Sequence, residues 1–268
     1  MRNFLKRGGS FFKKGQVAIF IIIAILAVGA ILSIYFLNRS ARTTERFEET
    51  NPQTFIQNCI EESLNNAIET ISLQGGSANP EGYLEYKGYK IEYACYTAED
   101  FKTCVVQKPF LQSHIENEIK KEIEEEFNFC FNQLVRNYED RGYNVNFKKG
   151  NLNVRLVPKR IIVNTTNEIT VTKGNTQTFK DFEIVVNSNL YELVWIANSI
   201  LEFEASLGDA DPTIYMDIFR WIKVEKISRE REGVVYIITD RRSGDKFQFA
   251  SRSLEWSPGH EASRIAIY

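Results

Sequence analysis

Histidine is scarce in this chain: two occur among 268 residues, His114 and His260. Serine, cysteine and threonine nucleophiles usually need a histidine base beside them. We expect His114, at the start of a predicted helix, to be solvated, and His260 to lie in a loop near the C-terminus. The sequence also has no G-x-S-x-G, G-x-x-x-x-G-K-[ST], H-E-x-x-H or EF-hand pattern. These absences predict a protein that is not an enzyme and holds no cofactor or metal.

Clusters of basic residues are missing after residue 16. Residues 1–16 hold five Lys or Arg and no acidic residue, whereas the rest of the chain holds 28 basic and 35 acidic residues. Phosphate backbones are bound by clustered Lys and Arg. The acidic body therefore argues against nucleic acid as a partner.

An uncharged apolar run covers residues 17–37. An α-helix of this length spans roughly 31 Å, the thickness of a bilayer core, and exceeds the apolar core of a secretory signal peptide. Five basic residues precede the run, and Arg39, Arg42 and Arg46 follow it. The positive-inside rule then places residues 1–16 in the cytoplasm and 38–268 outside. The sequence predicts a single-pass protein of the cell membrane with the lipid bilayer as a partner.

Residues Lys13–Gln16, "KKGQ", directly precede the apolar run. This arrangement resembles the class III signal peptides of archaeal type IV pilins. The resemblance implies a prepilin-type peptidase that cleaves between Gly15 and Gln16, and a subunit that packs its apolar helix in a filament with other subunits. Pilin-like helices usually carry Glu at the fifth mature position, where this chain has Phe20. A cleaved leader and an uncut anchor both stay open.

Beyond a short linker at 38–50, the periodicity predicts one domain over 51–268, with 51–142 and 143–268 as an alternative division into subdomains. Apolar residues at helical spacing predict helices at 52–73, with Asn51 as N-cap, and at 110–138. Asn189 and Glu192 have the spacing of a capping box and predict a helix from there to Leu207. Asp211-Pro212 predicts a short helix that reaches Trp221.

Alternating apolar residues predict strands in the rest of this region. They form a hairpin at 82–96, a hairpin that turns at Lys149-Gly150-Asn151, and two final strands joined by "RRSGD"; further strands are expected at 160–163, 168–172 and 179–187. The resulting class is α+β: one N-terminal transmembrane helix, then an extracytoplasmic domain of packed helices and mostly antiparallel strands. The segments "FNFCFNQL" and "FEIVVNSNLYELVWIANSI" are similar to an uncharacterised group of single-pass proteins from small-genome archaea, which implies architecture and location but no activity.

Four cysteines occur: Cys59, Cys95, Cys104 and Cys130. In a domain outside the membrane they suggest two disulfides, for which three connectivities exist. Cys59 and Cys130 lie on the apolar stripes of the two predicted helices, so helix packing favours the pairs Cys59–Cys130 and Cys95–Cys104. Reduced structural thiols stay an alternative. A zinc site does not fit, because the chain has no C-x2-C pair.

Two further surface features bear on function. Asn164-Thr165-Thr166 is a sequon that we expect to lie between strands as a glycosylation site, while the sequon at Asn38 is close to the membrane. The Tyr-rich segment 83–96 is a candidate recognition patch, or a hairpin packed on the helices. We expect a membrane-anchored surface protein that binds a surface or envelope component; the alternatives are a minor-pilin-like subunit and a surface hydrolase.

Overall fold

The computed structural model describes residues 26, 28, 29, 51–229 and 232–253. The chain divides into two units, Met1–Thr50 and Asn51–Tyr268. Among the described residues no helix is both long and apolar enough to cross a membrane. Apart from Leu26, Val28 and Gly29, the predicted span 17–37 lies outside the described residues, as do the predicted processing site at Gly15–Gln16, Asn38 and His260.

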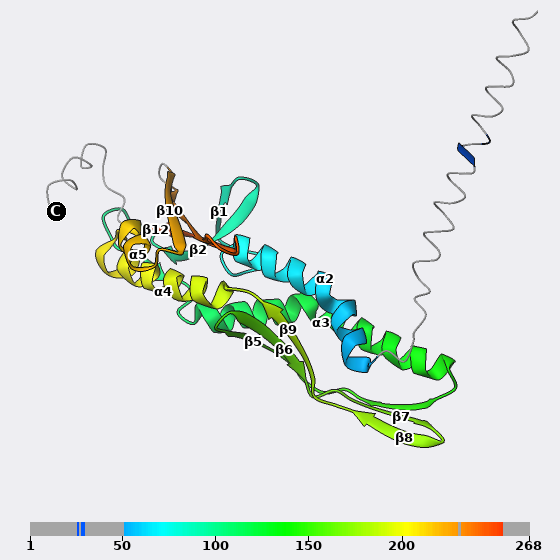
Figure 1. Cartoon of the computed structure of the whole chain (residues 1–268). Coiled ribbons are helices and arrows are strands. Elements are labelled where there is room, and N and C mark those ends of the chain that lie inside the picture. Colours follow the sequence, from blue (N-terminus) through cyan, green and yellow to red (C-terminus); the bar gives the residue numbers. More distant parts are fainter. Residues whose placement is uncertain (1–25, 27, 30–50, 230–231, 254–268) are drawn as a thin grey trace, which may run out of the picture. The chain divides into compact units, whose positions relative to one another are not determined.

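The second unit is α+β, as the sequence predicts, with four helices and twelve strands in its described part. Figure 1 shows the long helices α2 (Pro52–Leu73) and α3 (Leu111–Asp140) side by side, with α4 (Leu190–Leu207) and the short α5 (Pro212–Ile218) later in the chain. The stripes predicted for α2 and α3 are buried. The residues that were predicted on these stripes and are buried in the structure are Ile56, Ile60, Leu64 and Ile71 on α2, and Ile115, Ile119, Ile123, Phe127 and Phe131 on α3.

A six-stranded sheet combines strands from both ends of this unit. Its order is β1-β2-β12-β11-β10, with β3 also paired to β2. The strands are β1 (Tyr83–Tyr86), β2 (Tyr89–Tyr96), β3 (Val105–Val106), β10 (Ile222–Arg229), β11 (Gly233–Asp240) and β12 (Lys246–Arg252). Only the β2–β12 pair is parallel. Because β2 and β12 are neighbours, the segments 51–142 and 143–268 share this sheet.

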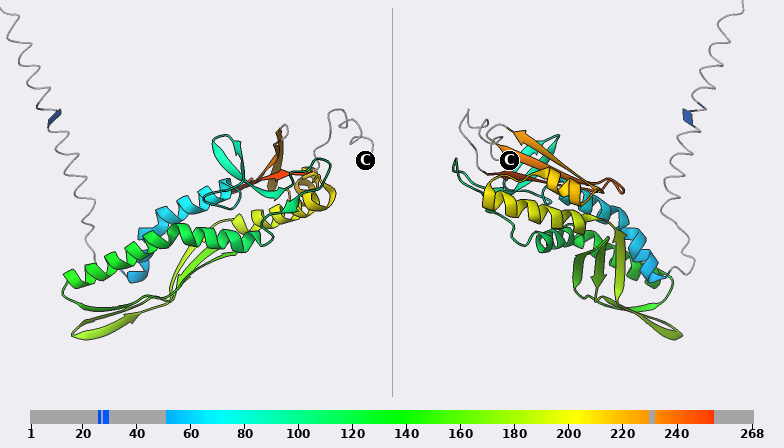
Figure 2. Two further views of the ribbon diagram at one scale, coloured as in Figure 1. Left: turned by 180° about the vertical axis from the view of Figure 1, so that it is seen from behind. Right: turned by 60° about the vertical axis from the view of Figure 1, so that its left-hand side comes forward.

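Six strands between α3 and α4 form a meander that bends in the middle. They are β4 (Asn144–Lys148), β5 (Leu152–Val157), β6 (Arg160–Thr165), β7 (Glu168–Lys173), β8 (Asn175–Phe179) and β9 (Phe182–Asn187). β5, β6 and β9 pair beside α3, while β4, β7 and β8 pair beyond the bend. The two views of Figure 2 show the β7–β8 hairpin extending from the β5–β6–β9 sheet. All pairs in the meander are antiparallel.

The hairpin predicted at Lys149-Gly150-Asn151 is wrong. β4 and β5 pair with β7 and β6, respectively, and not with each other. Gly150 has no positive φ, and its N–H donates to Asn167 Oδ1 at 2.6 Å. This glycine is therefore needed for the close approach of the neighbouring strand at the bend and does not reverse the chain.

Substitution of Gly150 tests this reading. A Cβ at Gly150 would lie 2.3 Å from the carbonyl carbon of Thr166. We expect Gly150→Ala to lower the free energy of unfolding by about 1–3 kcal/mol, because backbone atoms must shift. Gly82→Ala is the control, since no atom lies within 4 Å of its added Cβ, and we expect a change within about 0.5 kcal/mol. Urea unfolding of both variants measures the difference; equal stabilities would contradict it.

Three smaller predictions need correction. Asn189 precedes α4 but makes no capping bond with its side chain; the Leu190 N–H is bonded by Ser188 Oγ instead. α5 ends at Ile218 rather than Trp221. Strand β10 was not predicted, because charged residues interrupt the alternation of "IKVEKISR". Asp211 does cap α5, accepting from the Thr213 N–H at 2.8 Å, and Gly208 ends α4 in the left-handed region.

Candidate binding groove

The Tyr-rich hairpin β1–β2 carries exposed aromatic rings. Its turn is Lys87–Gly88, both with positive φ, which directs Tyr86 and Tyr89 to paired positions. Lys87 Nζ lies 5.1 Å from the centre of the Tyr86 ring, and Lys90 Nζ lies 4.9 Å from that of Tyr83. These cation–π contacts hold the rings at the surface. The expected packing on the helices does not hold for the hairpin tip, because Leu84 and Ile91 are buried against Val235, Ile237 and Ala250 of the sheet. Tyr83 and Tyr89 are 37% and 41% exposed, and a recognition patch stays a prediction.

A groove of about 510 Å³ lies between this hairpin turn, the C-terminal half of α2, the start of α4 and the β11–β12 turn. This volume is within the range of small-ligand sites. Its lining combines aromatic, aliphatic, amide and charged side chains, among them Ile68, Glu69, Leu73, Tyr86, Lys87, Tyr89, Leu193, Glu225, Asp245, Lys246 and Gln248. We refer to this feature as the hairpin groove.

Hydrogen bonds fix the base and one wall of the hairpin groove. Gln248 Nε2 donates to the Leu73 carbonyl at 2.8 Å, which joins β12 to the end of α2. The Asn189 N–H donates to Asp245 Oδ2 at 2.8 Å, and its Nδ2 donates to Asp240 Oδ2 at 2.8 Å. The turn that provides Asp245 and Lys246 is therefore tied to the start of α4. A pre-formed wall of this kind limits the ordering cost of binding.

The chemistry of the hairpin groove suits a ligand with both apolar faces and hydrogen-bonding groups. Tyrosine rings offer flat apolar contact with a hydroxyl at the end. Gln248, Glu225 and Asp245 offer acceptors, and Lys87 and Lys246 offer donors. No family model, curated protein or solved structure matches this chain. The kind of ligand that fits the groove is therefore inferred from the residues that line it.

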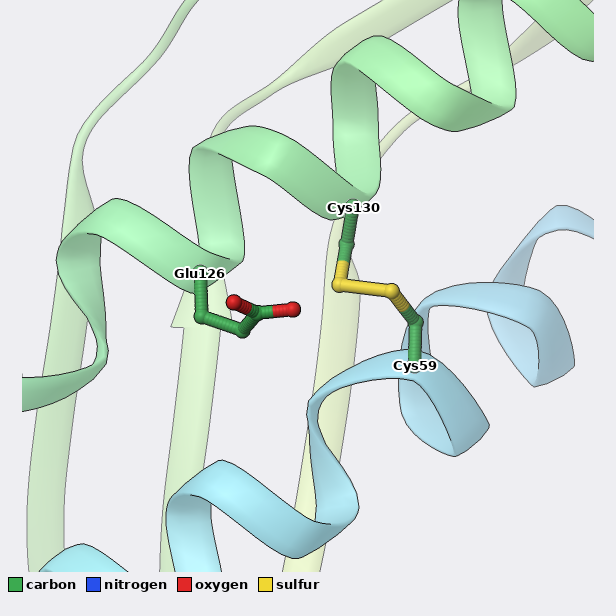
Figure 3. Close-up of side chains that lie close together, drawn as sticks. All are labelled: Cys59, Glu126 and Cys130. Carbon is green, nitrogen blue, oxygen red and sulfur yellow. A yellow bond between two sulfur atoms is a disulfide. The ribbon is translucent and has the colours of Figure 1, made fainter.

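A second groove, of about 400 Å³, lies between α2 and α3 and is lined by Cys59, Glu62, Asn66, Glu122 and Glu126, among others. Figure 3 shows Glu126 beside the Cys59–Cys130 disulfide. Ligand atoms of these three residues lie within 4.8 Å of one another. Both sulfurs are bonded in the disulfide, so the cluster presents one carboxylate and no thiolate to a metal ion.

Both predicted disulfides are present, and they use all four cysteines. Cys59–Cys130 joins α2 to α3 across 71 residues of sequence, and Cys95–Cys104 closes a loop of nine. The prediction for Asn164 is wrong in one respect. This residue lies within β6, the central strand of its sheet, paired to Asn153 and Glu183 on either side, and is half-buried rather than placed between strands.

His114 is not a solvated side chain, contrary to the expectation. Its Nε2 lies 2.7 Å from Ser77 Oγ, and Ser77 Oγ donates to Glu92 Oε2 at 2.5 Å. Lys108 Nζ lies 3.4 Å from Glu92 Oε1. The sequence could not indicate this cluster, because its residues come from three separate elements. Ser77 is 3% exposed and bonded on both sides, so its hydroxyl has no open face for a substrate; the cluster joins the end of α2 to β2 and α3.

The His114 environment gives a pH prediction. Burial, and then the charge of Lys108, lower the pKa of His114 below its usual 6.5. Because the pKa is lower in the folded state, the unfolded chain takes up the proton first as the pH falls through 6.5. The free energy of unfolding of the protein therefore decreases below that pH. An NMR titration of the imidazole C–H signal of His114, which is assigned with the His114→Gln variant, should have its midpoint below pH 6.5. Lys108→Gln should raise the pKa. A midpoint above 6.5 in the unsubstituted protein would contradict the burial argument.

Proposed function

We propose that this chain is a single-pass, membrane-anchored surface protein whose second unit is a non-catalytic, disulfide-stabilised binding domain outside the membrane. The observation that carries the proposal is the pair of disulfides, which use every cysteine of the chain. Disulfides of this kind form in oxidising compartments. The apolar run at 17–37, with more basic residues before it than after it, supports an anchor with its N-terminus in the cytoplasm.

The location is tested by adding protease to intact cells that produce the full chain. Protease should release fragments of residues 51–268, and non-reducing mass spectrometry should find a peptide that links Cys59 to Cys130. A cytoplasmic protein carried in the same cells is the control for lysis. Protection of the domain until the cells are broken, together with four free thiols, would overturn the proposal.

Within this function, we assign ligand binding to the hairpin groove. Tyr89 lines the groove and is 41% exposed, and Tyr83 on the same hairpin is 37% exposed but does not line it. The two residues therefore make a matched pair. Tyr89→Ala should reduce retention of the detergent-solubilised full chain on isolated cell envelopes about tenfold or more, as expected for a central aromatic contact. Tyr83→Ala should leave retention unchanged; equal losses would place the contact elsewhere.

A pilin-like subunit is the second candidate, and the segment Lys13-Lys14-Gly15-Gln16 favours it. In this case a prepilin-type peptidase would leave Gln16 as the first residue. N-terminal peptide analysis of protein from the native membrane decides whether cleavage occurs. Recovery of the chain in sheared filaments would then favour the pilin-like function over a single anchored protein. A chain that still carries residues 2–15 would exclude this candidate.

A further inference from the structure

Helices α4 and α5 expose a row of large apolar side chains. On α4 these are Trp195, Phe203 and Leu207, which lie along one i, i+4 row of the helix at successive intervals of eight and four residues. On α5 they are Ile214 and Ile218. Trp195 is 56% exposed and Ile218 is 66% exposed. We call these five residues the α4–α5 patch. It shares no residue with the hairpin groove.

Two contacts bring α5 and the residue that follows it against the Trp195 side of α4. Ser199, midway between Trp195 and Phe203, has its Oγ 3.1 Å from the Tyr215 hydroxyl on α5. The ring centre of Trp195 lies 5.8 Å from that of Phe219, next to Ile218. Figures 1 and 2 both show α5 beside α4. The buried face of α4 packs inward through Leu193, Ile196, Ile200 and Leu201, so within residues 51–229 and 232–253 no other element covers the patch.

The two helices that carry the patch have acidic side chains and no basic ones. Residues 190–219 include six acidic side chains and no lysine or arginine. Glu204 is buried, and Asp209 pairs with Lys226. Glu202 and Asp217 are exposed, on α4 and α5 respectively. Arg220 follows α5, and Arg242, near Trp221, is paired with Asp240. The exposed rim of the helices themselves is therefore acidic.

The acidic rim distinguishes between three kinds of molecule that could cover the α4–α5 patch. A second copy of the chain would bring the same acidic groups against each other, and an anionic bilayer would also repel them, whereas a basic segment would be attracted. We propose that the α4–α5 patch docks a basic amphipathic helix of a partner protein. Apolar residues of that helix would cover Trp195 and its neighbours, and its lysines or arginines would face Glu202 and Asp217.

The test uses the full chain in zwitterionic nanodiscs, with Trp221→Phe and Trp256→Phe so that Trp195 is the only tryptophan. Urea unfolding first verifies that this protein keeps its stability. The probes are two synthetic amphipathic helices with the same leucine face, one with lysine and the other with glutamate on the polar face. Empty nanodiscs are titrated in parallel to correct for peptide bound to lipid. Trp195 emission reports burial at the patch itself.

The lysine helix should shift Trp195 emission to shorter wavelength and bind about tenfold or more tightly than the glutamate helix, with an affinity that falls as salt rises. Glu202→Lys/Asp217→Lys should remove or invert the preference. Glu124→Lys/Glu125→Lys, the same charge change on exposed residues of α3, should preserve it. Equal binding of both helices, or an unchanged preference in the α4–α5 variant, would overturn the proposal. Burial of Trp195 by self-association or by anionic vesicles in place of the lysine helix would also overturn it.

Discussion

Replacing Cys59 and Cys130 together by alanine should lower the free energy of unfolding by about 4 kcal/mol. This disulfide closes a loop of 71 residues, and the loop-closure entropy of the unfolded chain rises with loop length. The bond also fixes α2 against α3 (Figure 3), and the packed stripes of these helices form much of the core. Chemical unfolding of the full chain, oxidised and variant, measures the difference.

The second disulfide is the internal control for this prediction. Cys95→Ala/Cys104→Ala opens a loop of nine residues, for which the same relation gives about 2.5 kcal/mol. The Cys59/Cys130 variant should therefore unfold at lower denaturant concentration than the Cys95/Cys104 variant. The reverse order would show that local packing, and not loop closure, sets the contribution of each bond.

Glu204→Ala should cost about 3–5 kcal/mol of stability, the second large effect. This carboxylate is 2% exposed. Its oxygens accept bonds from the Tyr236 hydroxyl at 2.5 Å, Ser251 Oγ at 2.8 Å and the Ala210 N–H at 3.0 Å. Lys226 Nζ lies 3.8 Å away. Alanine would remove the acceptor of three buried donors, of which the Tyr236 hydroxyl keeps only the Ala210 carbonyl at 3.5 Å, and would weaken the pairing of one ammonium group.

Two further variants separate the causes of that loss. Glu204→Gln keeps an acceptor oxygen and most of the shape, so we expect a smaller loss, about 1–3 kcal/mol. Glu202→Ala, exposed on the same helix, should change stability by less than about 0.5 kcal/mol. Burial, and then the charge of Glu204, raise the pKa of the Tyr236 hydroxyl well above its usual 10, which keeps it a donor. Thermal unfolding at pH 7 compares the variants; a Glu204→Ala loss as small as that of Glu202→Ala would contradict the account.

The helices could be predicted from the sequence because their signals are local. The bounds of α2 agree with the spacing of Ile56, Ile60 and Leu64 and with the Asn51-Pro52 start. The disulfide pairing also followed, because Cys59 and Cys130 lie on stripes that must be buried together. Turn signals were less reliable. Lys149-Gly150-Asn151 has the composition of a hairpin turn, yet the partner of each strand is set by contacts across the sheet.

The candidate sites needed the tertiary structure. The hairpin groove draws residues from α2, the β1–β2 turn, α4 and the β11–β12 turn. The patterns of these segments reveal which residues are apolar, but not that the segments meet. The same holds for Ser77, Glu92 and His114, and for the acceptors around Glu204. In each case a polar side chain finds its partner far along the chain.

By itself, the sequence determined the α+β class and the course of the long helices, and it favoured the observed pairing of the cysteines. Each of these depends on spacing along a single element, where a period of 3.6 or 2 residues states which face is buried. Only the tertiary structure decided that β2 and β12 lie in parallel, that the meander bends at Gly150, and that Trp195 and Ile218 are exposed among the described residues. These features depend on which elements pack together, and this is set by the burial of apolar surface across the whole core.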